Sequence, residues 1–185
     1  MRIAFTGSHG TGKTTLIEEL KNLDRFKNYV FHQNLTRSLR DRVPINEQGT
    51  ELTQVFVINK HMERLVDKNS ILDRCLIDGY IYTSYLYKKG KISEWIYRYA
   101  HDLMYTFLDL YDVIFYICPE FNLPEDGVRS NSLSFRDDIV SLFEDIIGQL
   151  KHSKKVSIVK ITGTVEERIQ QVVRWVEKNE GINPK

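Results

Sequence analysis

The stretch that decides the fold is residues 2–15, Arg-Ile-Ala-Phe-Thr-Gly-Ser-His-Gly-Thr-Gly-Lys-Thr-Thr. Its first part, Arg2–Thr6, has the apolar centre Ile3-Ala4-Phe5 and is predicted to form the first strand. The next residues match the spacing G-x-x-x-x-G-K-[ST] through Gly7, Gly12, Lys13 and Thr14. Apolar residues then recur at helical intervals, so a strand, a glycine-rich turn and an amphipathic helix are expected in direct succession.

A turn of this kind predicts a phosphate-binding loop. Glycines allow a tight path in which successive backbone N–H groups point at phosphate oxygens, and the helix that follows adds its free amides. We expect Lys13 to neutralise the β- and γ-phosphates of ATP, and Thr14 to hold Mg²⁺. His9 stands at a position that tolerates variation, so we assign it to shaping the backbone. The nucleotide-binding residues predicted here are Gly7, Ser8, His9, Gly10, Thr11, Gly12, Lys13, Thr14 and Thr15.

Outward from this stretch, short apolar runs alternate with helical patterns. Such alternation indicates an α/β fold with a parallel sheet covered on both sides by helices, and functional groups at the carboxyl ends of the strands. We expect one domain over residues 1–177 and a flexible tail over 178–185. The predicted strands span residues 2–6, 29–33, 70–73, 112–118 and 156–161, and the helical patterns after the first are centred on residues 47–68, 80–85, 96–110, 135–150 and 165–176.

Composition excludes several other classes of protein. The chain has 185 residues, of which 42% are hydrophobic and 28% charged, with a formal net charge of +1. That charge argues against binding to nucleic acid mainly through bulk electrostatics, without forbidding a local basic patch. No apolar run is long enough to span a membrane or to form a signal-peptide core. Cys75 and Cys118 form no disulfide framework, and the histidines outside the loop have no metal-ligand spacing, so we expect a cytoplasmic protein.

Most other classes of phosphate-loop protein lack support in the sequence. The chain has no Asp-x-x-Gly switch, and its one Asn-Lys pair, Asn59-Lys60, continues with His61 rather than toward the Asp of a guanine-reading sequence. An ABC signature is absent, and no predicted strand ends in the Asp-Glu pair of motor or AAA-type ATPases. These absences favour kinases that act on small molecules.

The end of the third predicted strand supports that branch. Its residues, Ile-Leu-Asp-Arg-Cys-Leu-Ile-Asp-Gly-Tyr at 71–80, resemble the Asp-Arg-x or Glu-Arg-Ser element of thymidylate kinases and deoxynucleoside kinases. The resemblance implies that Asp73 lies near Mg²⁺ or the acceptor and that Arg74 contacts phosphate. A carboxylate there can hold magnesium's water shell or accept a hydroxyl proton. The alternative is a surface Asp–Arg pair that caps the following helix.

A polar segment after the fourth predicted strand contains two further arginines, Arg129 and Arg136. The run Asp-Gly-Val-Arg at 126–129 resembles nicotinamide-riboside kinases and their phage relatives. That resemblance implies a lid over about residues 119–136 whose arginines close over the transferred phosphoryl group. The alternative is a solvated loop in which these arginines pair with neighbouring carboxylates.

Two further nucleotide-binding residues, Thr162 and Gly163, follow the last predicted strand. In the related kinases this loop runs past the adenine ring, so the resemblance implies backbone contacts to adenine. A glycine-containing turn between a strand and a helix is equally a common connection in such folds.

The acceptor side has weaker signals. Deoxynucleoside kinases usually place a glutamate base after the second strand, whereas this chain has Gln33 and Asn34, and an amide is not a general base. A phosphate-bearing acceptor needs no base, and basic residues around Arg37 favour one, although a solvated basic helix face fits equally. Gln54 is expected to pair with a base edge, with Arg64 behind it. Four tyrosines, at 80, 82, 85 and 87, either line a base pocket or pack with their hydroxyls toward solvent.

These features together predict a three-layer P-loop kinase fold with a five-stranded parallel sheet and an arginine-bearing lid. The expected activity is transfer of the γ-phosphoryl group of ATP, with Mg²⁺, to a small nucleotide-like acceptor. A deoxynucleoside monophosphate ranks first, and a nucleoside or nicotinamide riboside second. A polynucleotide kinase and a non-catalytic ATP-binding regulator are the remaining alternatives. A homodimer is compatible with the sequence.

Overall fold

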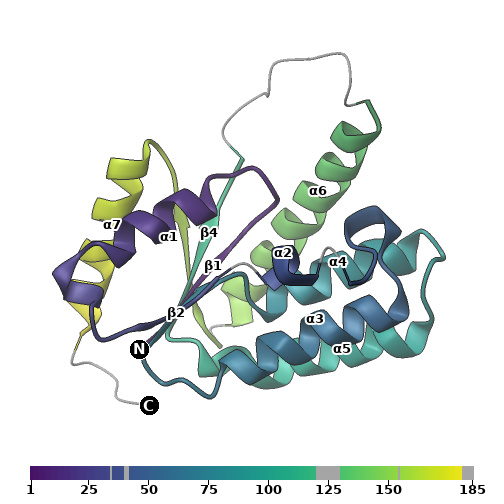
Figure 1. Ribbon diagram of the computed structural model, residues 1–185, viewed down its shortest axis with the longest axis horizontal. Helices are drawn as coiled ribbons and strands as arrows, with labels where there is room; N and C mark the ends of the chain where they lie inside the picture. The colour runs from purple at the N-terminus through teal and green to yellow at the C-terminus, as the bar shows by residue number, and fades with distance from the viewer. Residues whose placement is uncertain (34, 40–41, 120–129, 154, 181–185) are drawn as a thin grey trace.

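A computed structural model describes residues 1–33, 35–39, 42–119, 130–153 and 155–180. Side chains at 36, 37 and 130–133 are outside this description. The described part of the chain contains a five-stranded sheet in which every pairing is parallel (Figure 1). Along the sheet the order is β2-β3-β1-β4-β5, and the strands are β1 (Arg2–Thr6), β2 (Val30–His32), β3 (Ser70–Asp73), β4 (Val113–Ile117) and β5 (Ser157–Ile161).

Helices cover both faces of this sheet, which gives three layers. In Figure 1, α1 and α7 lie on one side, while α3, α4, α5 and α6 lie on the other. Their bounds are α1 (Lys13–Lys21), α2 (Leu35–Leu39), α3 (Glu51–Arg64), α4 (Leu76–Lys88), α5 (Glu94–Phe107), α6 (Ser130–Ser153) and α7 (Val165–Asn179), with short 3-10 turns at Asp24–Phe26, Asn46–Gln48 and Leu108–Leu110.

Two hydrophobic cores form because successive strand residues face opposite sides of the sheet. Ile3 and Phe5 of β1 pack on the side of α1 and α7, whereas Ala4 between them packs on the side of the other helices. In β4, Phe115 and Tyr116 divide in the same way. Strands buried on both faces account for the continuous apolar runs that predicted a parallel sheet, and the expected fold class is confirmed.

The strand ends agree with the expectations to within one residue, and three larger differences concern helices. The pattern over 47–68 becomes a 3-10 turn followed by α3, because Thr50 caps the helix by accepting a hydrogen bond from the Thr53 amide. Helix α6 begins at Ser130, inside the range expected for the lid, so Arg136 lies on a helix; residues 120–129, with Arg129, lie outside the described residues. Helix α7 continues to Asn179, past the expected start of the tail.

No described helix is both long enough and apolar enough to cross a membrane.

Candidate phosphoryl-transfer site

The loop between β1 and α1 follows a path that only glycine adopts readily. Gly7, Gly10 and Gly12 have φ angles of 138°, 75° and 82°, in the region that residues with a Cβ atom rarely occupy. A Cβ at Gly7 would stand 2.5 Å from the carbonyl oxygen of Ile117, so β4 also passes too close for a side chain. These constraints explain the glycines of the motif physically.

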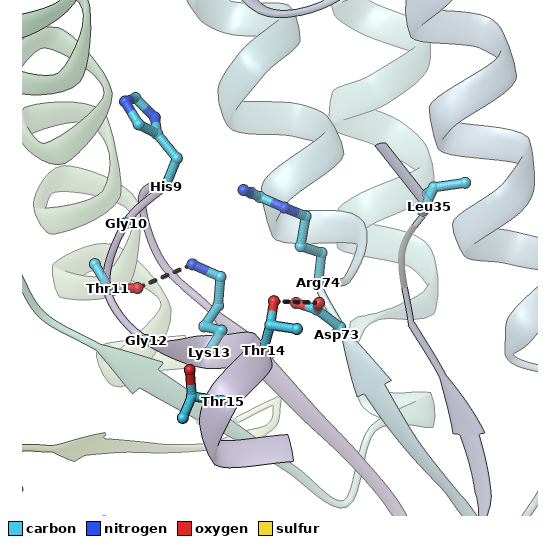
Figure 2. Close-up of a pocket in the computed structure, with 10 residues that line it drawn as sticks. All are labelled: His9, Gly10, Thr11, Gly12, Lys13, Thr14, Thr15, Leu35, Asp73 and Arg74. Carbon is cyan, nitrogen blue, oxygen red and sulfur yellow. Dashed lines mark hydrogen bonds between the residues drawn. The ribbon is translucent and has the colours of Figure 1, made fainter. Parts of the chain in front are cut away.

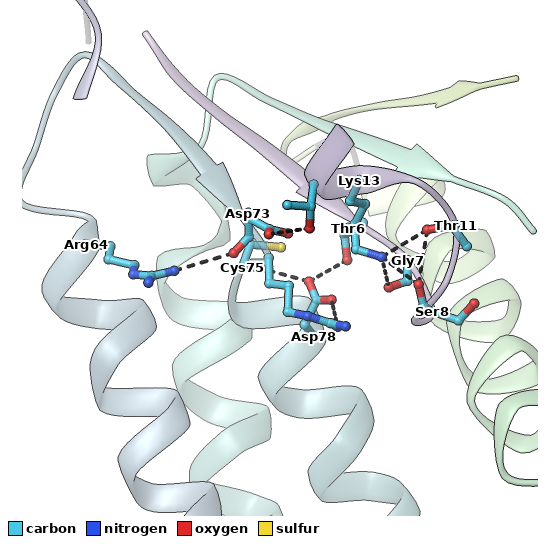
Figure 3. A network of polar contacts seen from close by, with 11 residues as sticks. Thr6, Gly7, Ser8, Thr11, Lys13, Arg64, Asp73, Cys75 and Asp78 are labelled. Carbon is cyan, nitrogen blue, oxygen red and sulfur yellow. Dashed lines mark hydrogen bonds and ion pairs between the residues drawn. The ribbon is translucent and has the colours of Figure 1, made fainter. Parts of the chain in front are cut away.

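Lys13, the first residue of α1, turns back into this loop. Its ammonium donates hydrogen bonds to the carbonyl oxygens of Gly7 (2.8 Å) and Ser8 (2.5 Å) and to the Thr11 hydroxyl (3.0 Å; Figure 3). Burial and the nearby Arg74 charge lower the pKa of Lys13 to about 7. A bound polyphosphate would favour the protonated form, because an opposite charge stabilises the ammonium.

A cleft of about 320 Å³ opens beside the loop. The three elements that meet there are the phosphate loop with the start of α1, the first residue of α2 and the end of β3 (Figure 2). The lining residues are His9, Gly10, Thr11, Gly12, Lys13, Thr14, Thr15, Leu35, Asp73 and Arg74. The sheet therefore brings the loop and the Asp73-Arg74 pair to one cleft.

Asp73 and Thr14 meet on the floor of this cleft. Because Asp73 is paired with Phe5 in the register of β3 and β1, it ends its strand beside the loop. The Thr14 hydroxyl donates to the Asp73 carboxylate at 3.3 Å. One carboxylate and one hydroxyl are hard oxygen ligands, which suits Mg²⁺ bound together with phosphate oxygens and water.

Arg74 is held by a buried carboxylate that the sequence analysis did not identify. Asp78 is 2% exposed and accepts hydrogen bonds from Arg74 Nη1 (2.8 Å), the Thr6 hydroxyl (2.7 Å) and the Cys75 amide (3.0 Å; Figure 3). The Arg74 guanidinium also lies 5.3 Å from the centre of the Tyr82 ring. The signal in the sequence is an acid at the third position of α4, where it completes a capping box.

His9 connects the loop to α6. Its ring stacks on Phe135 with centroids 5.6 Å apart. Burial, followed by the charges of Arg74, Arg136 and Lys13, lowers the pKa of His9 to about 4. Arg136 is itself buried, and its charge acts on His9, which lines the cleft.

Arg168 is a second residue that was not predicted from the sequence, and it supports the phosphate loop from the side of α7. Arg168 of α7 donates a hydrogen bond of 2.7 Å to the Thr11 carbonyl. Its position matched the apolar stripe of α7, four residues before the buried Val172. A charged residue on the buried side of an amphipathic helix was the signal that could have identified it.

The predicted adenine contacts lie apart from the residues that line the 320 Å³ cleft. The Gln171 side chain accepts a hydrogen bond from the Thr162 amide (3.4 Å) and donates one to the Thr162 carbonyl (2.7 Å). Gly163 has a φ of 93°, which explains the glycine. A ligand that used the backbone of Thr162 would compete with Gln171.

The predicted acceptor residues divide into three cases. Gln54 is buried in a narrow pocket beside Arg74, where its side chain lies 3.0 Å from the Thr83 hydroxyl. Arg64 instead donates to the carbonyl oxygens of Gln33 (3.1 Å) and Asp73 (3.4 Å), so it ties together the ends of β2 and β3. Arg37 lies in α2, with its side chain outside the described part.

The chain is similar to several known proteins. A family model described as an AAA domain matches residues 2–168. No curated protein matches the chain. Among solved structures, a deoxyadenosine kinase from M. mycoides with bound dCTP has a TM-score of 0.65 at 18% identity, covering 96% of this chain and 100% of its own.

Two other solved structures share the fold. The NadR protein in complex with NR has a TM-score of 0.67 at 19% identity, and the match covers 100% of this chain but 52% of NadR. The YorR protein from Bacillus subtilis, in complex with phosphorylated GDP, has a TM-score of 0.59 at 15% identity over the full length of both chains. At these identities the likeness establishes the fold alone.

Proposed function

We propose that this chain, which belongs to the AAA domain family whose model matches residues 2–168, transfers the γ-phosphoryl group of ATP to a nucleoside-type acceptor. Its P-loop kinase fold provides the site. The missing Asp-Glu pair therefore does not separate this chain from AAA-type proteins. The observation that carries the proposal is the cleft in which the phosphate loop meets Asp73 and Arg74.

On the donor side, the loop amides and Lys13 bind the β- and γ-phosphates. The three oxygens that accept hydrogen bonds from the Lys13 ammonium belong to the loop, so phosphate oxygens can replace them as acceptors without moving α1. Arg168 and His9 hold the loop from two sides, through Thr11 and Phe135 respectively. A loop fixed in this way loses little conformational entropy on binding, which favours affinity.

Mg²⁺ is part of the proposal, and the residues present fit it. Thr14 and Asp73 are the oxygen ligands that would hold the ion, directly or through water. When bound, the ion supplies neutralisation of charge between the β- and γ-phosphates. No group of three or more His, Cys, Asp or Glu side chains in the described residues forms a metal-binding cluster, and Mg²⁺ in phosphoryl-transfer sites typically needs only one or two carboxylates beside the phosphates.

Transfer itself then depends on positioning and on positive charge around the moving group. Lys13 and Arg74 line the cleft. The charge of Arg136 contributes to lowering the pKa of His9, which also lines the cleft. We assign Arg74 and Arg136 to stabilising charge on the transferred phosphoryl group. Arg129 keeps the same assignment as a prediction from sequence.

For the acceptor, the narrow pocket beside Arg74 is the best candidate, because Arg74 lines both it and the phosphate cleft. A base in that pocket would point its sugar toward the phosphates. We rank a deoxynucleoside monophosphate first, since Gln33 at the end of β2 is not a base and an anionic acceptor needs none. A nucleoside is the second candidate, because Asp73 lines the same cleft and can accept a hydroxyl proton.

The test is release of ADP from MgATP in the presence of nucleosides, nucleoside monophosphates, nicotinamide riboside and oligonucleotides. Lys13→Ala serves as the blank, because it removes the charge that neutralises the phosphates. We expect one small acceptor to stimulate release well above the blank. Equal slow hydrolysis with every compound would indicate a regulator, and stimulation by oligonucleotides alone would indicate a polynucleotide kinase.

We also propose that the protein works in the cytoplasm, where the thiols of Cys75 and Cys118 would stay reduced, as both are free cysteines.

A further inference from the structure

The pocket beside Arg74 contains a buried histidine that the sequence analysis left without a role. His61 of α3 is 1% exposed, and neither of its ring nitrogens has a hydrogen-bond partner in the described part of the chain. Buried polar groups in native proteins almost always have partners, and an unpaired one destabilises the fold. The two nitrogens of His61 therefore need a separate explanation.

The position of His61 in the pocket explains its unpaired nitrogens. It lines a pocket of about 40 Å³ together with Gln54 and Arg74, and the apolar side chains of Ile45 and Val57 form part of the wall. Volume on this scale accommodates the edge of a planar ring or a small number of water molecules. Since Arg74 lines both this pocket and the phosphate cleft, whereas His61 lines the pocket alone, a compound reaching from the cleft into the pocket would contact His61 there.

The ring is held in place by close packing of α3 against α4. A Cβ on Gly79 of α4 would stand 3.5 Å from Cδ2 of His61 and 3.3 Å from Cγ1 of Ile58. Glycine at this position lets the two helices approach. Packing of this kind restricts the positions that the His61 ring can take, as expected for a group that recognises a ligand.

Charge restricts what His61 can recognise. Burial, with the charges of Arg64 and Arg74 added, lowers the pKa of His61 to about 3. Its imidazole is therefore neutral, with one N–H donor and one lone pair. The charges that contribute to this shift are those of the two arginines, whereas the Asp78 carboxylate, which lines the same pocket, is paired with Arg74. A ring with a fixed positive charge is disfavoured here, while a neutral ring with a carbonyl oxygen suits both the N–H donor and the positive surroundings.

We propose that His61 is a specificity-determining residue, which hydrogen-bonds the edge of a neutral, carbonyl-bearing heterocyclic base and selects against a cationic ring. This inference rests on the proposed function, because it names the acceptor class for the same site. Gln54 shares the recognition, and the ribose and its phosphate or hydroxyl extend toward Arg74.

The experiment compares kcat and KM for a panel of acceptors in the wild type and in His61→Met. The panel contains nucleosides and monophosphates of the common neutral bases, and nicotinamide riboside as the cationic ring. Losing a hydrogen bond to a neutral group should raise KM for the best acceptor about 10-fold, with a smaller change in kcat. His61→Asn, which keeps a donor and an acceptor, should recover part of the loss.

Thermal stability separates recognition from a structural role. His61→Met removes two unpaired polar atoms, so its Tm should rise while its KM worsens. Ser84→Ala is the matched control, because the Ser84 hydroxyl of α4 is also buried without a partner in the described residues, yet it lines a different pocket with Tyr80 and Gln149. This variant should raise Tm and leave KM unchanged.

An unchanged KM in His61→Met would overturn the inference and indicate that ordered water satisfies the histidine. Nicotinamide riboside as the best wild-type acceptor would overturn it as well, while leaving a kinase function intact. If the wild type phosphorylates no acceptor, the proposed function fails first and the inference falls with it.

Discussion

Arg168 and Thr11 are 157 residues apart in the chain, yet the guanidinium of one donates a 2.7 Å hydrogen bond to the carbonyl of the other. Helix α7 thereby fixes the back of the phosphate loop. The same guanidinium lies beside Gly12, because a Cβ at that position would stand 3.4 Å from Arg168 Nη1. We therefore expect nucleotide binding to depend on Arg168, which contacts the loop through the Thr11 carbonyl.

Replacing Arg168 with Met should weaken binding of an ATP analogue. The Thr11 carbonyl would lose its charged donor, and hydrogen bonds of that kind contribute about 1.5–3 kcal/mol. Isothermal titration calorimetry with a non-hydrolysable analogue and Mg²⁺ measures the change. Arg174→Met, an exposed position on the same helix, is the control and should bind as the wild type does; equal affinity in both variants would contradict a supporting role for Arg168.

Nucleotide affinity should fall as pH rises from about 7 to 9. The free protein holds Lys13 with a pKa of about 7, and bound phosphates raise that pKa. Above pH 7 binding must therefore take up a proton at Lys13, which costs more free energy as protons become scarcer. Calorimetry in buffers of different ionisation enthalpy measures the uptake, and Lys13→Met should abolish this contribution. If the variant showed the same pH dependence, the proton would be taken up by a group other than Lys13.

Asp78→Asn should destabilise the fold by about 3 kcal/mol, because breaking a buried ion pair leaves an uncompensated charge. The change removes the carboxylate that fixes Arg74 while keeping the shape of the side chain. Urea denaturation measures the free energy of unfolding. Glu94→Gln is the comparison: it breaks the exposed Glu94–Arg98 pair and should cost no more than about 0.5 kcal/mol. Similar losses in both variants would argue against a buried anchor at Asp78.

Gly7→Ala should fail to fold or lose nucleotide binding, since the new Cβ would collide with the carbonyl of Ile117 in β4 at 2.5 Å. Gly148→Ala tests the same chemical change where nothing lies within 4 Å of the added atom. That position is in the interior of α6, where alanine stabilises a helix by up to about 1 kcal/mol relative to glycine. Soluble yield and Tm distinguish the two variants, and a stable, nucleotide-binding Gly7→Ala would disprove the close approach of β4.

Much of the fold was predictable because its signals are local. The glycine spacing before Lys13 predicts the tight backbone path of the phosphate loop. The apolar run at β4 predicts a strand that is buried on both faces. The end of β3 at Asp73 was predicted correctly for the same reason. Boundaries were less accurate where one side chain sets them, as Thr50 does for α3 by capping it.

The sequence by itself determined the phosphate loop, the parallel sheet and the presence of Asp73-Arg74 at a strand end, since neighbouring residues carry that information. Only the tertiary structure decided that Asp78 anchors Arg74, that Arg168 supports Thr11, and that His61 is buried in the narrow pocket beside Arg74, with no hydrogen-bond partner among the described residues. The physical reason is that a residue's chemistry depends on burial and on the charges around it, and packing brings those together from distant parts of the chain.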